Sequence, residues 1–436
     1  MDQLAILLTC LNSLISSSTL KQLSIISAGI LCMTGKVTML GISRWTEQGG
    51  SYRTIQRFFK KTIPWDLLNW SLIKSKISQC DVVLIAGDAT TVTKSGKKTY
   101  GIGRFFSSIY SRAVPGIAFQ VLSLIDVEKR QSSPILVEQM ISTPKPNKPK
   151  STKTAVKKAP GRPKGSKNKN KTDVVLNSEM TQVKAMLIKL MDLIGSTLKP
   201  IYFVYDGAFG NNAAVQMVRQ VGRGLHLISK LQKNSKLYLP WTGKNSGKGR
   251  PRVYGKRLDY KNIPDVYLHS TEEENDMLTQ TYQLQVLHKN FAVPLNVVII
   301  CNRNTRTGAQ AHVILFSTDL NLSYLEIMQY YELRFQIEFN FRDAKQHWGL
   351  EDFMVTEKQA VMNSANIAFW MVNVSQQLLP LSNAQSILDL KASRHGIKYA
   401  REVFKLLPKN VQAINNSTFW ERISTLGRIH DLKIAS

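Results

Sequence analysis

The chain has little cysteine, and its acidic residues are far outnumbered by basic ones. Four cysteines (Cys10, Cys32, Cys80 and Cys301) are spread over 436 residues with no C-x-x-C pair. This spacing argues against a zinc site and a disulfide scaffold, so a reducing cytosol is the expected compartment. The 30 Asp and Glu residues face 58 Lys and Arg residues, a formal charge of +28. Such a charge indicates a polyanionic partner, although ribosomal and membrane-surface proteins share it.

Long hydrophobic runs are also missing. Two apolar stretches, residues 4–8 and 23–33, are separated by polar residues such as Asn12 and Lys21, and Asp2 occupies the region where a signal peptide is positive. We therefore expect amphipathic helices, with no signal peptide, no membrane span and no membrane partner. No internal repeat is evident. The 43% hydrophobic content permits a large buried core, divided into two or three domains.

The most informative segment is residues 331–345, YELRFQIEFNFRDAK. If it is one helix, five of its polar and charged residues share an arc of about 80°. They are Tyr331, Arg334, Glu338, Arg342 and Lys345. A carboxylate aligned with phosphate-seeking side chains, and bordered by apolar residues, predicts an active-site helix for a polyanion. The alternative is a solvated amphipathic helix in which Glu338 and Arg342 form an ordinary i,i+4 pair.

Two upstream aspartates follow apolar segments that read as buried strands. Residues 81–88 are typical of a core strand from whose end Asp88 emerges, and residues 199–206 form a second apolar strand that ends in Asp206-Gly207 and leads into a helix. An aspartate at the end of a strand is often only a turn former or a helix cap. The functional interpretation therefore depends on all three carboxylates together.

These segments together resemble the DDE transposases of bacterial insertion sequences, in the class named for its Y-R-E-K signature. The spacing Y-x2-R-x3-E-x6-K is complete in residues 331–345, and Asp88 and Asp206 occur in the family order. The resemblance covers about residues 40–375. It implies an α/β fold with an RNase H-like mixed sheet flanked by helices, a β-rich insertion and an all-helical N-terminal domain.

The resemblance also implies a function: a transposase that binds the terminal inverted repeats of its element, cleaves the DNA ends and joins them to target DNA. Asp88, Asp206 and Glu338 would be catalytic and would hold two Mg²⁺ or Mn²⁺ ions, which suit hard oxygen ligands. Synapsis of two double-stranded DNA ends implies a homodimer, in the bacterial cytoplasm at the nucleoid. The residues expected to bind DNA near the cut are Tyr331, Arg334 and Lys345, with Arg342 added from the helical geometry.

Other basic segments supply further candidate DNA contacts. Residues 51–59 resemble the family's N-terminal DNA-binding segment, although they could equally form a packing helix. The segment 142–172 carries ten lysines and one arginine between Lys145 and Lys171, and residues 160–164, PGRPK, resemble an AT-hook. The alternative there is a flexible basic loop that contacts phosphates without sequence preference. These segments and the predicted hairpins and strands give the remaining candidates: Arg53, Arg57, Arg162, Lys164, Arg104, Lys230 and Arg250.

The expected domains are a helical DNA-binding domain at residues 1–78, a catalytic core at 79–234 and 295–375, a β-rich insertion at 235–294, and a C-terminal helical region at 376–436. The insertion has no tryptophan after Trp241, so the route of excision stays open. Two other functions also stay open. One is a metal-dependent nuclease or resolvase on the same core, and the other is a catalytically silent DNA-binding protein derived from a transposase.

Overall fold

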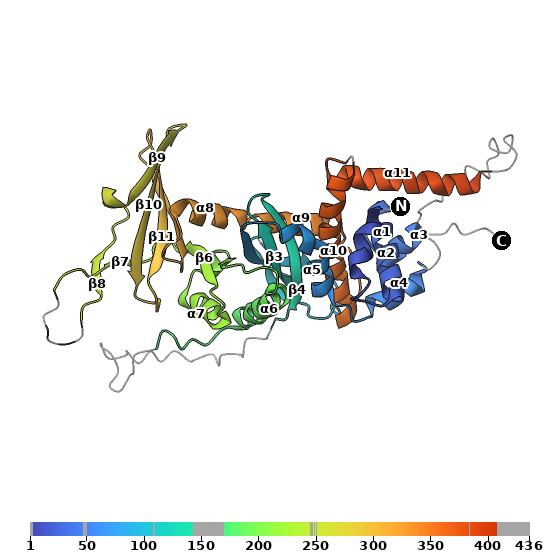
Figure 1. The fold of residues 1–436 in the computed structure, drawn as a ribbon, viewed down its shortest axis with the longest axis horizontal. Coiled ribbons are helices and arrows are strands. Elements are labelled where there is room, and N and C mark those ends of the chain that lie inside the picture. Colours follow the sequence, from blue (N-terminus) through green and yellow to red (C-terminus); the bar gives the residue numbers. More distant parts are fainter. Residues whose placement is uncertain are drawn as a thin grey trace.

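A computed structural model describes residues 3–46, 50–107, 110–142, 170–244, 251–382 and 384–407, with Gly247 and Gly249. Within these residues, twelve strands form one mixed sheet; strands form one end of the molecule and helices form the other (Figure 1). The strand order is β2-β3-β1-β5-β6-β12-β11-β10-β7-β8, with β4 beside β3 and β9 beside β10. The predicted α/β mixed sheet is therefore confirmed.

The central strands have the sequence pattern of a buried sheet. β1 pairs in parallel with β5 and antiparallel with β3, and β5 pairs in parallel with β6. Strands with neighbours on both sides and helices over their faces bury almost every side chain, so they read as continuous apolar runs. The bounds are β1 Val83–Thr93, β2 Gly103–Ser107, β3 Arg112–Asp126, β4 Gln131–Met140, β5 Tyr202–Val204 and β6 His226–Leu231.

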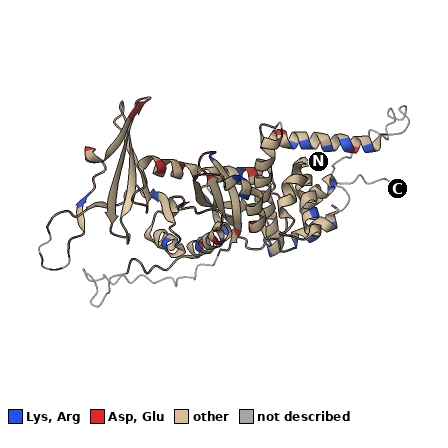
Figure 2. Ribbon diagram, in the orientation of Figure 1, with Lys and Arg blue, Asp and Glu red and all other residues tan. Residues whose placement is uncertain are grey.

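The remaining strands extend the sheet to one side (Figure 1). β12 pairs antiparallel with β6, β11 with β12, and β10 with β11. The strands of the predicted insertion therefore continue the same sheet and do not form a separate layer. The tip of the β9–β10 hairpin carries three exposed acidic residues, Glu272, Glu273 and Glu274 (Figure 2). The bounds are β7 Leu237–Pro240, β8 Tyr254–Arg257, β9 Leu268–Glu274, β10 Met277–His288, β11 Leu295–Asn304 and β12 Gln310–Ser317. A short 3-10 helix, η3 (Asp265–Tyr267), precedes β9.

Helices form the other side of the molecule (Figure 1). The described residues before β1 form helices only, as the sequence predicts: α1 Gln3–Leu7, η1 Leu8–Leu11, α2 Ser17–Cys32, α3 Met39–Trp45, α4 Tyr52–Phe59 and α5 Trp65–Ile77. Serine or threonine side chains cap three of them, because Ser16, Thr38 and Ser51 accept from backbone N–H groups in the first turns of α2, α3 and α4. α11 (Ile387–Leu406) lies along α2. No described helix has the length and apolarity needed to span a membrane.

Helices pack on the sheet, and one of them, α10 (Lys358–Leu378), joins it to the N-terminal helices. α10, followed by η4 (Leu379–Leu381), packs against β4, α5 and α9, while α6 (Ser178–Ile194) packs against β3, β4 and α7 (Asn212–Val221). Asn363 of α10 is fully buried and makes a polar link to α4 and α5. Its Nδ2 donates to the backbone oxygens of Phe59 at 2.8 Å and Lys61 at 2.7 Å, and its Oδ1 accepts from Trp65 Nε1 at 2.8 Å.

The segment predicted to be one signature helix is two helices. α8 (Tyr324–Leu333) ends before Arg334, and α9 (Gln336–Gln346) begins after Phe335. Between them, the N–H groups of Phe335, Ile337 and Glu338 donate to the residue three positions back, so the helical ladder is locally tightened. The predicted apolar border also differs, because Phe335 is 48% exposed. The sequence contains no proline or glycine in this segment that would have indicated the break.

Candidate active site

Asp88 lies at the point where β1 loses its second neighbour. β1 continues to Thr93, so Asp88 is inside the strand and not at its end as the sequence suggested. The parallel partner β5 ends at Val204, opposite Ala86, whereas β3 pairs with β1 along its whole length. The Asp88 backbone oxygen accepts from Gln120 Nε2 at 3.0 Å, and Oδ1 accepts from the Ala89 N–H at 2.7 Å. These bonds fix the carboxylate at an opening in the sheet.

Asp206 follows β5, the strand next to β1. Its Oδ1 accepts from the Ala208 N–H at 3.0 Å and caps the short helix η2 (Gly207–Phe209). Its backbone oxygen accepts from Ser229 Oγ at 2.6 Å. Asp206 is therefore a helix cap, as one interpretation of the sequence held, and it also lies beside the first aspartate. The neighbouring Tyr205 ring packs so closely on Gly87 that a Cβ there would lie 2.7 Å from the ring.

Glu338 reaches the same region from the first turn of α9. The helix is fixed on the sheet by Asn340, which is buried and donates to Ser132 Oγ at 2.8 Å. Ile337 and Phe341 are buried on the same helix, so Glu338 lies on the partly exposed side. A carboxylate in the first turn of a helix also interacts favourably with the helix dipole.

Arg334, in the break between α8 and α9, joins two of the carboxylates. Its Nη1 lies 3.0 Å from Asp88 Oδ2, and its Nη2 lies 3.4 Å from Glu338 Oε1. The Arg334 guanidinium is 5.9 Å from the centre of the Tyr331 ring. Two of the residues predicted to bind DNA therefore contact or adjoin the predicted catalytic carboxylates.

The ionisation of Asp88 depends mainly on burial and then on its charged neighbours. Burial raises the pKa of Asp88 to about 6. The Ala89 N–H and Arg334 oppose this rise, and the negative charges of Asp206 and Glu338 add to it. Burial also raises the pKa of Tyr331. The charges of Asp206 and Glu338 both reach Asp88, and we call the three predicted carboxylates the carboxylate cluster.

A fourth carboxylate near Asp206 was not predicted. Glu179 lies in the first turn of α6, after the cap Asn177, and its pKa is raised by burial and then by the charge of Asp206. The sequence offered only an ordinary capped helix start, Asn-Ser-Glu, as a signal. Its proximity to the site follows from the packing of α6 on the sheet.

The metal predicted for this site fits the donors in chemistry. Asp88, Asp206 and Glu338 supply only carboxylate oxygens, the ligands that Mg²⁺ and Mn²⁺ prefer. In the described part of the chain, however, no group of three or more His, Cys, Asp or Glu side chains is arranged to hold a metal ion. Arg334 is the cation that bridges Asp88 and Glu338.

The other residues predicted to bind DNA are divided between the site and distant surfaces. Lys345 Nζ donates to the Thr91 backbone oxygen of β1 at 2.9 Å and pairs with Glu351 at 3.4 Å, so it lies beside the cluster. Arg342 points outward, is 52% exposed and lies 4.8 Å above the Phe339 ring. Lys230 is exposed on β6, and its backbone oxygen lies against the turn at Gly207 and Gly210 that follows Asp206.

The remaining candidates are elsewhere. Arg53 and Arg57 are exposed on α4 in the N-terminal helices, and Arg104 is exposed on β2, where it donates to the Ala113 backbone oxygen at 2.7 Å. The structure does not bring these three residues to the carboxylates. Arg162, Lys164 and Arg250, with most of the basic segment 142–172, lie outside the described residues.

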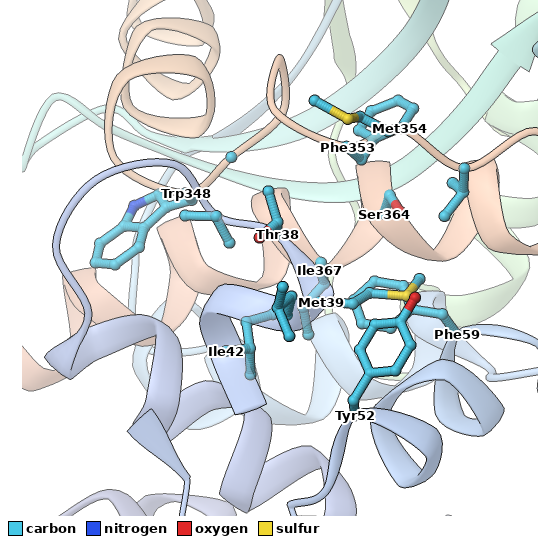
Figure 3. Close-up of a pocket in the computed structure, with 14 residues that line it drawn as sticks. Thr38, Met39, Ile42, Tyr52, Phe59, Trp348, Phe353, Met354, Ser364 and Ile367 are labelled. Atoms are coloured by element: carbon cyan, nitrogen blue, oxygen red, sulfur yellow. The ribbon is translucent and has the colours of Figure 1, made fainter. Parts of the chain in front are cut away.

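An apolar cavity of about 250 Å³ lies between the N-terminal helices and the segment after α9 (Figure 3). Met39 and Ile42 of α3 face Trp348, Phe353 and Met354 across it. None of the three clustered carboxylates lines this cavity. It is therefore separate from the candidate active site.

The model of one protein family, described as DDE superfamily endonuclease, matches residues 7–288, more than half of the chain. This chain belongs to the DDE superfamily endonucleases. The match contains Asp88 and Asp206 and ends before Glu338, so it does not bear on the carboxylate that the sequence predicts as the third. Membership agrees with the RNase H-like interpretation of the mixed sheet and with DNA as the substrate. A search of curated proteins finds no match.

Proposed function

We propose that this DDE endonuclease is the transposase of an insertion sequence of the Y-R-E-K class, which cleaves the ends of its element and joins them to target DNA. The observation that carries the proposal is the cluster of Asp88, Asp206 and Glu338 beside Arg334, with Tyr331 and Lys345 at its border. Carboxylates for metal and cations for phosphate are the two parts that in-line displacement at phosphorus needs.

In this proposal Asp88, Asp206 and Glu338 would hold one or two Mg²⁺ or Mn²⁺ ions. When bound, such ions activate the attacking oxygen and stabilise the leaving oxygen. Arg334 offers a planar set of donors that matches a phosphate group, and Lys345, whose Nζ is fixed by the Thr91 backbone oxygen, adds a positive charge beside the strand that carries Asp88. No side chain needs to form a covalent intermediate with the DNA.

The wider DNA path follows the remaining basic residues. Lys230, whose backbone oxygen lies against the turn after Asp206, would contribute to this path. Arg342, Arg53, Arg57 and Arg104 would extend the contact over the exposed surface of α9, the N-terminal helices and β2. Holding two DNA ends at once requires two copies of the active site, so we propose a homodimer in the synaptic complex. Action on a bacterial element places the protein in the cytoplasm, at the nucleoid. We also propose that the domains have the limits predicted from the sequence, with DNA binding in residues 1–78 and catalysis in residues 79–234 and 295–375.

The decisive experiment is a strand-transfer assay. Inverted repeats that flank the gene supply the substrate, used both intact and as pre-cut ends with a free 3′-hydroxyl, with supercoiled plasmid as target and Mg²⁺ present. A transposase cleaves the intact repeats and joins the pre-cut ends to the plasmid. A nuclease or resolvase on the same core cleaves without joining, and this result would contradict the proposal.

The matched variant is Asp88→Asn. We expect it to abolish cleavage and joining while it changes DNA affinity by no more than about twofold, because phosphate contacts and the metal site are separate contributions. Equal losses of binding and cleavage would show that Asp88 acts through the fold or through DNA binding. Unchanged cleavage would remove Asp88 from the catalytic set and favour a different active site.

A further inference from the structure

Arg334 bridges two carboxylates of the cluster. Its guanidinium spans two elements that are far apart in sequence, with Nη1 3.0 Å from Asp88 on β1 and Nη2 3.4 Å from Glu338 on α9. The Arg334 side chain is 14% exposed, less than Asp88 at 22% or Glu338 at 42%. A positive charge thus already bridges two of the three oxygen-donor side chains.

We propose that Arg334 is an internal counter-cation, which keeps divalent metal out of the cluster until DNA draws its guanidinium away onto a phosphate. The proposal rests on the proposed function, because it takes Asp88 and Glu338 to be metal ligands. It adds that metal binding depends on DNA, so that the protein does not hold a loaded active site in the absence of substrate.

The charge of Arg334 is the first reason. An arginine side chain stays protonated over the whole pH range in which proteins are folded, so its positive charge leaves the cluster only if the side chain moves. A divalent ion shared by Asp88 and Glu338 would meet that charge at close range and be repelled. Metal and the observed position of Arg334 therefore compete for the same carboxylates.

The second reason is that Arg334 has an unpaired hydrogen-bond donor. Among the described residues its buried Nε has no hydrogen-bond partner. An unpaired buried donor carries an energetic penalty, so the arrangement without DNA leaves the guanidinium partly unsatisfied. A phosphate can accept from Nε and one Nη together, in the bidentate manner typical of arginine.

The location of Arg334 is the third reason. It lies in the break between α8 and α9, where the N–H of Arg334 still donates to Tyr330 at 3.3 Å but the next N–H groups donate only three positions back. The backbone at Arg334 thus lies outside a continuous helix, so it can shift together with the side chain without breaking the middle of a helix. Because coupling between two ligands is reciprocal, DNA that releases the carboxylates must raise metal affinity, and metal must raise DNA affinity.

The test measures Mn²⁺ binding to the full chain by electron paramagnetic resonance, in which free Mn²⁺ is counted directly. Each protein is titrated alone and with a duplex that carries the terminal repeat, and ions bound by the duplex alone are subtracted. For the wild type we expect the duplex to lower the Mn²⁺ dissociation constant about tenfold. Arg334→Ala without DNA should already bind Mn²⁺ about tenfold more tightly than the wild type, and DNA should add little.

Arg130→Ala is the matched control. Arg130 pairs with Glu332 of α8, so this variant also removes one guanidinium–carboxylate pair and one positive charge, but away from the cluster. It should bind Mn²⁺ as the wild type does, with and without DNA. Arg334→Lys keeps a charge that cannot span both carboxylates, and should fall between the wild type and Arg334→Ala. Circular dichroism at the titration temperature establishes that each variant is folded.

Two results would overturn the inference in different ways. If Asp88→Asn abolishes Mn²⁺ binding but Arg334→Ala binds no more tightly than the wild type, the metal site stands and the counter-cation role is wrong. If no protein shows Mn²⁺ binding that depends on Asp88, with or without DNA, the metal site of the proposed function fails as well.

Discussion

Asp88 should weaken the folded state at neutral pH, so replacing it with asparagine should stabilise the protein. Burial raises the pKa of Asp88 from 3.8 to about 6, and a difference of one pKa unit corresponds to about 1.4 kcal/mol. The folded protein thus binds the Asp88 proton more tightly than the unfolded chain does. This contribution favours the folded state below about pH 4 and is lost as the pH rises through 6.

The magnitude follows from the two pKa values. At pH 7 the ionised Asp88 costs about 3 kcal/mol of folding stability, and at pH 4.5 about 1 kcal/mol. Asparagine resembles the protonated acid, because it is neutral and keeps an oxygen for the Ala89 N–H. Asp88→Asn should therefore raise the free energy of unfolding by up to about 3 kcal/mol at pH 7 and by less at pH 4.5.

Urea denaturation in EDTA at both pH values measures this difference. Asp173→Asn, at an exposed position, should change the free energy of unfolding by no more than about 0.5 kcal/mol and serves as the control. Two results would refute this reasoning: Asp88→Asn is neutral or destabilising at pH 7, or its effect does not grow between pH 4.5 and pH 7. Either would show that burial and the neighbouring carboxylates do not raise the pKa of Asp88.

Two further predictions test the scaffold and the DNA path. Asn363→Ala leaves the buried Trp65 N–H without its acceptor and two backbone oxygens without their donor, and should cost about 3 kcal/mol or more in urea denaturation. Asn262→Ala, at an exposed position, should cost less than about 0.5 kcal/mol, and equal costs would refute the structural role of Asn363. Lys230→Ala should weaken binding of any DNA sequence similarly and lower the salt dependence by about one ion, measured by fluorescence anisotropy at several salt concentrations. A change confined to one DNA sequence would refute a phosphate contact.

The sequence by itself determined the α/β class, the helical N-terminal region and the strands at which the two aspartates lie, whereas the role of Glu338 as the third carboxylate stays a prediction. These features depend on local patterns. Apolar runs specify buried strands, and capping residues specify helix starts. Arg334 and Glu338 lie in contact as the spacing of residues 331–345 predicts, although the predicted single helix is two helices.

Only the tertiary structure decided which charged side chains lie next to one another in the cluster. β1 continues past Asp88 because β3 pairs with it along its whole length, and no local pattern contains that pairing. The break before α9, the position of Glu179 near Asp206 and the bridging contacts of Arg334 all depend on packing between segments that are distant in sequence. Local preferences choose the elements, but the distances between charged side chains are set by the contacts between those elements, and these distances decide which carboxylates share a cation.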